Sequence, residues 1–174
     1  MATTYSVLEC DTQQFGEMAA AFLASGVSLR FKAKGQSMRP LIRDGDILLA
    51  EPVDPHKARR GAVLLFTNAQ GRAVAHRVQR KRKASDGGAK FLMRGDQVEM
   101  NDGWVSEKDV LGVVSVVERN GASYRLDSFA QKGLGFGATL YQPGKPINHA
   151  VFSFGYWLMR KLPRMKRFLL KEEY

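Results

Sequence analysis

Cysteine and long apolar runs are scarce in this chain. A single cysteine, Cys10, occurs among 174 residues, so no intramolecular disulfide can form, which fits a reducing compartment. The longest stretch without Asp, Glu, Lys or Arg runs from residue 146 to residue 159, and about 20 apolar residues are needed to cross a bilayer. The first 29 residues carry acidic but no basic side chains, the reverse of a secretory signal. We therefore expect a cytoplasmic protein.

Acidic residues are also few, with 17 Asp and Glu against 27 Lys and Arg and a formal net charge of +10. The basic residues gather in two segments, 72–94 and 155–174. Such clusters attract nucleic acid or anionic lipid, or form an ordinary solvated surface. No helix-turn-helix pattern or zinc-ligand spacing accompanies them, so we do not expect a nucleic-acid partner. We expect neither a metal site nor a cofactor.

The hydrophobic pattern predicts a mainly β fold. We expect a helix capped by Asp11 and Thr12, ending near Ala24, with Phe15, Met18, Ala19 and Phe22 on one face. Alternating or apolar runs bounded by turn residues predict strands. The predicted strands are 27–34, 46–51, 62–67, 72–82, 90–94 and a hairpin of 110–119 with 123–127, while 95–107 is predicted as a polar loop.

The C-terminal part differs in composition, which suggests a boundary. We predict a catalytic-type domain over residues 1–127, followed by a Gly- and Pro-rich linker and a basic amphipathic helix within 128–174. The helix is too short in its apolar part to span a bilayer. It either lies in the headgroup layer of an anionic membrane, giving a peripheral contact with the inner membrane surface, or packs on the β domain. The sequence does not indicate an oligomeric state.

The segment from Gly35 to Asp46, GQSMRPLIRDGD, is the most informative one. Ser37 lies between a glycine and a Met-x-Pro turn, where stiff backbone can fix its side chain beside the core. A nucleophile needs such a fixed position. The alternative is an ordinary serine in a turn.

A serine nucleophile needs a base, and His76 is the best candidate. In the strand 72–80, RAVAHRVQR, His76 shares a face with Val74 and Val78. A histidine between inward-facing valines is costly unless it is paired. His56, in a polar loop, and His149, beside the C-terminal helix, are weaker candidates. The alternative is a satisfied core histidine.

Two aspartates follow the next strand and could orient the base. Asp96 comes directly after strand 90–94, which should lie near the strand of His76, and Asp102 follows six residues later. A carboxylate next to imidazole holds the base in its tautomer. The alternative is two aspartates in a solvated loop.

These segments together resemble the signal peptidase I superfamily of serine peptidases. The resemblance covers residues 27–119 and rests on G-x-S-M-x-P-x-x-x-x-G-D from Gly35, H-R-V from His76, R-G-D from Arg94 with a second aspartate, and V-L-G-V-V from Val110. Bacterial members and the related self-cleaving repressor peptidases use lysine as the base. His76 stands in that place, which is similar to the archaeal and endoplasmic-reticulum type.

The resemblance implies a β-rich catalytic core of the signal peptidase and self-cleaving repressor kind. It makes Ser37 the nucleophile and His76 the general base, with Asp96 and Asp102 as acidic partners. One of the two would orient the imidazole and the other would support the loop, and the sequence does not assign them. The implied activity is a serine endopeptidase that processes a peptide or protein precursor, which lies extended beside residues 27–34.

Two other functions remain open on the same fold. One is a non-catalytic peptide-binding module, although mere binding does not require all four polar residues. The other is a self-cleaving regulator, although the region before Gly35 is too short for a separate DNA-binding domain. Members of the Ser-His type normally carry an N-terminal transmembrane anchor, and we expect none here.

Overall fold

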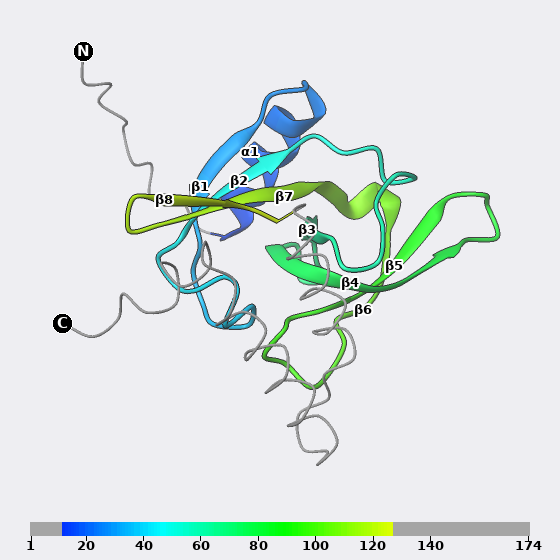
Figure 1. Ribbon diagram of the computed structural model, residues 1–174. Coiled ribbons are helices and arrows are strands. Elements are labelled where there is room, and N and C mark those ends of the chain that lie inside the picture. Colours follow the sequence, from blue (N-terminus) through cyan, green and yellow to red (C-terminus); the bar gives the residue numbers. More distant parts are fainter. Residues whose placement is uncertain (1–11, 127–174) are drawn as a thin grey trace.

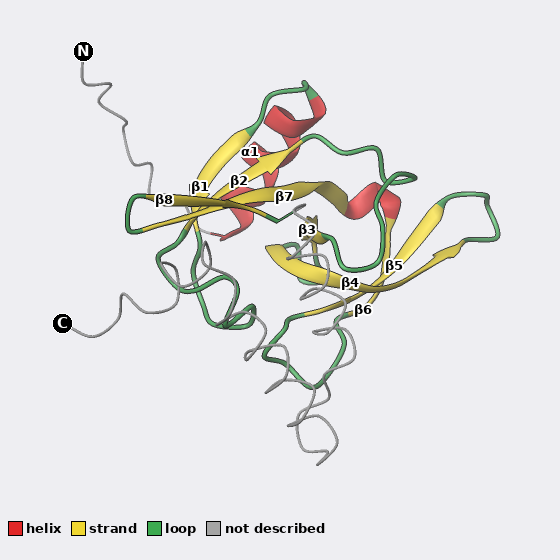
Figure 2. Ribbon diagram, viewed as in Figure 1, coloured by secondary structure: helices red, strands yellow, loops and turns green. Residues whose placement is uncertain are grey.

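A computed structural model describes residues 12–126 (Figure 1). Within this range the chain forms one α-helix, eight strands and one 3₁₀ turn (Figure 2). The predicted mainly β fold with an N-terminal helix is confirmed. The C-terminal helix and the boundary after residue 127 lie outside the described residues. In chain order the elements are α1(Thr12–Ala24), β1(Leu29–Lys32), β2(Ile47–Glu51), β3(Val63–Thr67), β4(Ala73–Lys83), β5(Ala89–Arg94), β6(Gly103–Ser106), η1(Glu107–Asp109), β7(Val110–Arg119) and β8(Ala122–Arg125).

All strand pairs are antiparallel, and the strands follow the order β1-β2-β7-β3-β4-β5-β6, with β8 on β7. Strand β7 joins the two halves of the sheet. It pairs with β2 along one side, while β3 and then β8 pair along its other side. Strand β3, between β7 and β4, is apolar and buried on both faces. The centre of the sheet is therefore core.

Strand β4 changes character along its length. Residues 76–79 are buried, whereas residues 80–83 are exposed and belong to a hairpin with β5 that extends away from the rest of the sheet (Figure 1). The pairing with β5 shifts register between Val78 and Arg80, which is the signature of a β-bulge. The candidate base His76 thus lies in the buried half of the strand.

Helix α1 covers one face of the sheet through its small and apolar residues. Ala19 and Leu23 are buried against Ala50 of β2 and Leu65 of β3. The helix ends at Ala24, and Gly26 follows with a φ of 86°, the left-handed conformation that glycine adopts without strain. Phe22, which the sequence places on the same helix face as Phe15 and Ala19, is not buried. Its side chain is 44% exposed, and Leu23, one position further around the helix, is buried instead.

The predicted polar loop 95–107 was wrong at its C-terminal end. Residues 103–106 form strand β6, which pairs with β5 and is followed by η1. The strand has four residues and only Val105 is buried, so the alternation was too short to indicate a strand. No helix within residues 12–126 is long and apolar enough to cross a membrane.

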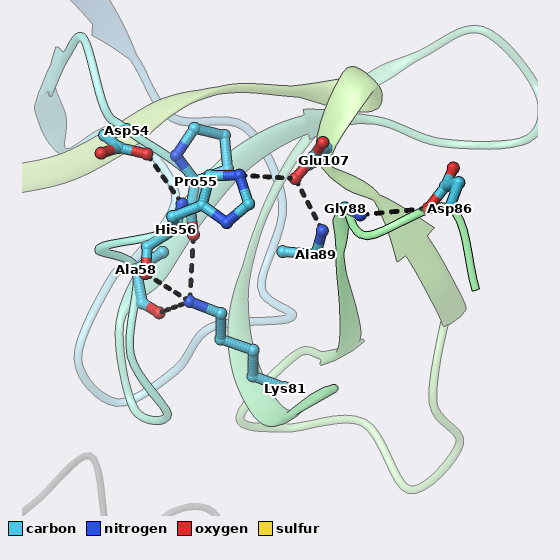
Figure 3. A network of polar contacts seen from close by, with 9 residues as sticks. All are labelled: Asp54, Pro55, His56, Ala58, Lys81, Asp86, Gly88, Ala89 and Glu107. Carbon is cyan, nitrogen blue, oxygen red and sulfur yellow. Dashed lines mark hydrogen bonds and ion pairs between the residues drawn. The ribbon is translucent and has the colours of Figure 1, made fainter. Parts of the chain in front are cut away.

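A network remote from the candidate site fixes the loop between β2 and β3 (Figure 3). The Lys81 ammonium group on β4 donates to the backbone carbonyls of Pro55, His56 and Ala58 at 3.2, 2.6 and 3.0 Å. The His56 ring lies 3.5 Å from a Glu107 carboxylate oxygen, which also accepts the N–H of Ala89 at 2.6 Å. His56 therefore belongs to this loop network.

Candidate active site

The loop that carries Ser37, residues 35–46, connects β1 to β2 and is called the nucleophile loop below. Its Met38 and Ile42 side chains are buried with Leu48, Val114 and other apolar residues. At the neck of the loop the N–H of Gly35 donates to Asp44 Oδ1 at 2.7 Å. Apolar burial and a closed neck together fix the backbone on both sides of Ser37.

Where the nucleophile loop joins β2, a second set of hydrogen bonds centres on Asp46. These contacts were not predicted from the sequence. Asp46 is buried and accepts the N–H of Arg43 at 2.7 Å and two guanidinium N–H groups of Arg119 at 2.7 and 2.5 Å. Arg119 also donates to the carbonyl of Leu41 at 3.1 Å. The sequence marked Asp46 as the last residue of the Gly35–Asp46 motif, but gave no sign of its partner Arg119.

His76 connects the nucleophile to an acid. Its Nε2 lies 2.8 Å from Ser37 Oγ, and its Nδ1 lies 2.6 Å from Asp102 Oδ2. We assign the proton to Nδ1, because a carboxylate only accepts, and Nε2 is then free to accept the serine proton. The inward position predicted for His76 is confirmed, since the residue is buried. Ser37, His76 and Asp102 thus form one continuous hydrogen-bonded chain.

The loop after β5, residues 95–102, is called the acid loop below. Its ends meet at strand β5, because the N–H of Asp102 donates to the carbonyl of Met93 at 2.9 Å. This closure aims the Asp102 side chain back at the His76 ring on the neighbouring strand β4. Closure through the backbone explains how a residue eight positions beyond the end of β5 reaches the base.

Asp96 makes different contacts from Asp102. Both of its carboxylate oxygens accept from Arg77, at 2.7 and 2.6 Å, and the two side chains are 4% and 3% exposed. Of the two aspartates left open by the sequence, Asp102 therefore contacts the imidazole and Asp96 does not. Arg77 was missed as a site residue, because period two put it on the face opposite His76. An arginine inside a run of buried strand residues was the available signal.

Gly95 brings the two loops into contact. A Cβ atom at this position would lie 2.7 Å from the Ser37 carbonyl oxygen, 3.0 Å from Ser37 Cβ and 3.1 Å from His76 Nε2. Any larger residue would have to displace the nucleophile or the base, so glycine is needed for close approach. The amide of Gln97, two residues after Gly95, donates to the Ser37 carbonyl at 2.8 Å. These contacts were also missed.

The charges around the acid loop are largely withdrawn from water. Arg94, at the end of β5, is buried; this burial lowers the pKa of Arg94, and the nearby Asp96 carboxylate acts in the opposite direction. Asp102 is more accessible, with 28% of its side chain exposed. Within residues 12–126 no cluster of His, Cys, Asp and Glu has the arrangement of a metal site.

The arrangement has the parts of a serine nucleophile system: a fixed hydroxyl, a base within hydrogen-bond reach, and a carboxylate that orients the base. Such a chain can transfer the serine proton while oxygen attacks a carbonyl carbon. It can also exist in a protein that only binds, so the geometry by itself does not establish turnover.

Comparison with known proteins indicates a distant and partial relationship. No family model matches the chain. The signal peptidase complex catalytic subunit SEC11C of Homo sapiens, and that of Mus musculus, is 31% identical over 86 residues. The match covers 44% of this chain and 44% of each relative, so the chain matches less than half the length of these curated proteins. The chain is therefore a partial, distant relative of a signal peptidase catalytic subunit.

Proposed function

We propose that this protein is a serine endopeptidase of the signal peptidase type, with Ser37 as nucleophile, His76 as general base and Asp102 as the acid that orients it. The observation that carries the proposal is the unbroken chain of contacts from Ser37 Oγ through the His76 ring to Asp102 Oδ2, at 2.8 and 2.6 Å. The partial relationship to a signal peptidase catalytic subunit supports the same class of reaction.

In the first half of the reaction His76 Nε2 removes the Ser37 hydroxyl proton while Oγ attacks the scissile carbonyl carbon. Asp102 stabilises the imidazolium that forms, without taking its proton. The backbone N–H of Ser37, with a neighbouring donor, stabilises the oxyanion, and losing one such donor costs on the order of 3 kcal/mol. The imidazolium then protonates the leaving amine.

In the second half, a water molecule attacks the acyl-enzyme carbonyl and gives its proton to His76. The serine is released when the tetrahedral intermediate collapses and Oγ recovers a proton from the imidazolium. The substrate is a peptide or protein precursor in extended form. Strand β1 is an edge strand of the sheet and leads directly into the nucleophile loop, so it offers main-chain hydrogen bonds beside Ser37.

The test is cleavage of a diverse library of extended peptides, followed by mass spectrometry. The wild-type protein should cleave a subset, and the resemblance predicts small residues just before the cleaved bond. Ser37→Ala and His76→Ala should remove this cleavage while the far-UV circular dichroism spectrum stays unchanged. Ser85→Ala, which changes an exposed serine in the turn between β4 and β5, is the matched control and should cleave normally.

Two results contradict the proposal. One is equal cleavage by wild type and Ser37→Ala, which would point to a contaminating peptidase or another nucleophile. The other is a wild-type protein that binds library peptides but releases no product, which favours a non-catalytic binding module.

A further inference from the structure

The Arg77–Asp96 pair has no place in the chemistry of the triad, although it lies beside it. Two charges that are only 3% and 4% exposed cost several kcal/mol each to remove from water. Apolar residues of similar volume often stabilise a fold as well as a buried ion pair does. Stability alone therefore does not explain why this ion pair is present. Its location beside the candidate active site suggests a functional role.

Arg77 is adjacent in sequence to the candidate base, and Asp96 is adjacent to two residues that contact Ser37. Arg77 follows His76 on β4, and its third donor, Nη1, binds the carbonyl of Gly61 just before β3 at 2.7 Å. Asp96 lies between Gly95 and Gln97, which contact Ser37 by van der Waals approach and by a hydrogen bond. The pair thus ties the strand of the base to the part of the acid loop that contacts the nucleophile.

Asp96 is also the one fully buried side chain that the acid loop contributes. Gln97, Glu99, Met100 and Asn101 are exposed, Val98 is half-buried, and Gly95 has no side chain. Van der Waals packing therefore fixes little of this loop. Its placement depends on the Asp96 carboxylate together with the two backbone bonds made by Gln97 and Asp102.

We propose that Arg77 is a positioning residue that acts through Asp96, fixing the acid loop so that Asp102 meets His76 Nδ1 and Gln97 meets the Ser37 carbonyl. The planar guanidinium group suits this role, because two parallel N–H bonds fix the orientation of a carboxylate as well as its distance. The inference rests on the proposed function for its kinetic test, and on geometry alone for its spectroscopic one.

The decisive variant replaces both charges, Arg77→Met together with Asp96→Leu, so that neither partner of the pair is left as a lone buried charge. We expect a cooperatively folded protein whose kcat falls about 10- to 100-fold with little change in KM, because an ångström-scale displacement of catalytic groups costs about that much. Arg77→Lys keeps the positive charge but cannot make two parallel hydrogen bonds to the carboxylate. Its kcat should lie between those of the wild-type protein and the double apolar variant. Lys81→Met is the control on the same strand: it removes the hydrogen bonds that Lys81 makes in the network of Figure 3 and should leave kcat unchanged.

A double-mutant cycle separates positioning from general weakening. If Arg77 acts through Asp102, adding Arg77→Met and Asp96→Leu to Asp102→Asn should slow the reaction by less than about threefold further, since coupled residues are not additive. If the combined variant instead loses kcat by the product of the two separate fold-losses, the proposal is overturned. So would wild-type kcat in the double apolar variant.

A proton NMR readout does not depend on turnover. The short contact between His76 Nδ1 and Asp102 should give a low-field proton resonance in the wild-type protein, and the double apolar variant should lose it while Lys81→Met keeps it. Loss of this resonance in a protein that cleaves nothing would support positioning and reject the proposed function. Its persistence in the double apolar variant would reject positioning whatever the activity.

Discussion

The nucleophile loop and the acid loop meet at His76, yet they are fixed in different ways. The nucleophile loop buries Met38 and Ile42, closes its neck with Asp44 and is braced by Asp46. The acid loop relies on the side chain of Asp96 and two backbone hydrogen bonds. Both loops contain a buried ion pair, but the nucleophile loop is also held by two buried apolar side chains, whereas the acid loop has no fully buried apolar side chain. Single changes should therefore affect activity through the acid loop and stability through the nucleophile loop.

The largest effect should come from Asp102→Asn, at the end of the acid loop. The amide offers Nδ1 no carboxylate, so the imidazole loses the partner that fixes its tautomer and stabilises its charge. We expect kcat to fall on the order of 10³- to 10⁴-fold, the scale seen for such a change in serine peptidase triads. Steady-state cleavage of a library-derived peptide measures it. Because Asp102 is partly exposed, the midpoint of urea unfolding should hardly move.

An Asp102→Asn variant with wild-type kcat would remove Asp102 from the mechanism. Asp96→Asn should, unlike Asp102→Asn, affect stability as well as activity. It leaves Arg77 buried without its anionic partner, so we expect a lower free energy of unfolding as well as a slower reaction.

A smaller effect should follow Gly95→Ala, which tests the contact between the two loops. The added methyl group would press on the Ser37 carbonyl and on His76 Nε2, and we expect kcat to fall about 10- to 100-fold. Gly112→Ala is the matched control. Gly112 lies on strand β7, and its Cβ would lie 2.7 Å from the carbonyl oxygen of Glu51 on strand β2, an equally tight approach to backbone.

Both glycine variants should lower the melting temperature, while only Gly95→Ala should lower the kcat of the folded protein. Measuring kcat well below both melting temperatures separates the two effects. Equal kcat values for the two variants would show that the interloop contact has no bearing on the reaction.

The smallest effect on activity should come from Asp46→Asn in the nucleophile loop. Arg119 would stay buried beside a neutral amide, and breaking a buried ion pair commonly costs about 3–5 kcal/mol. Met38 and Ile42 still anchor the loop, so kcat of the folded fraction should fall less than about threefold. Urea unfolding and kcat at low temperature test this pair of expectations. A loss of kcat as large as that of Gly95→Ala would mean that the two loops are secured alike.

The sequence predicted most of what depends on local pattern. The helix and seven of the eight strands were found close to their observed positions, because alternation and turn residues mark them. The remaining strand, β6, has only one buried residue and therefore shows no alternation of apolar and polar residues. Ser37 and His76 could be named as candidates because each stands out locally, a serine in a stiff turn and a histidine between valines.

The choice between Asp96 and Asp102 could not be made from the sequence, since both follow the same strand. It depends on the backbone bond from Asp102 to Met93 and on a guanidinium group from another strand. Arg77, Gly95 and Asp46 were missed for the same reason. Their roles arise from contacts between segments that are distant in the sequence. Neither the periodicity nor the spacing of residues predicts such contacts.

Strand β6 begins directly after Asp102, and its Trp104 is 40% exposed beneath the Arg82 guanidinium group, 4.0 Å from the ring centroid. An indole two residues from Asp102 gives the acid loop an optical label of its own. The chain has one other tryptophan, Trp157, so Trp157→Phe leaves Trp104 as the sole tryptophan, which can be excited selectively over the tyrosines. Its emission then reports when the acid loop shifts, in real time and without any added dye.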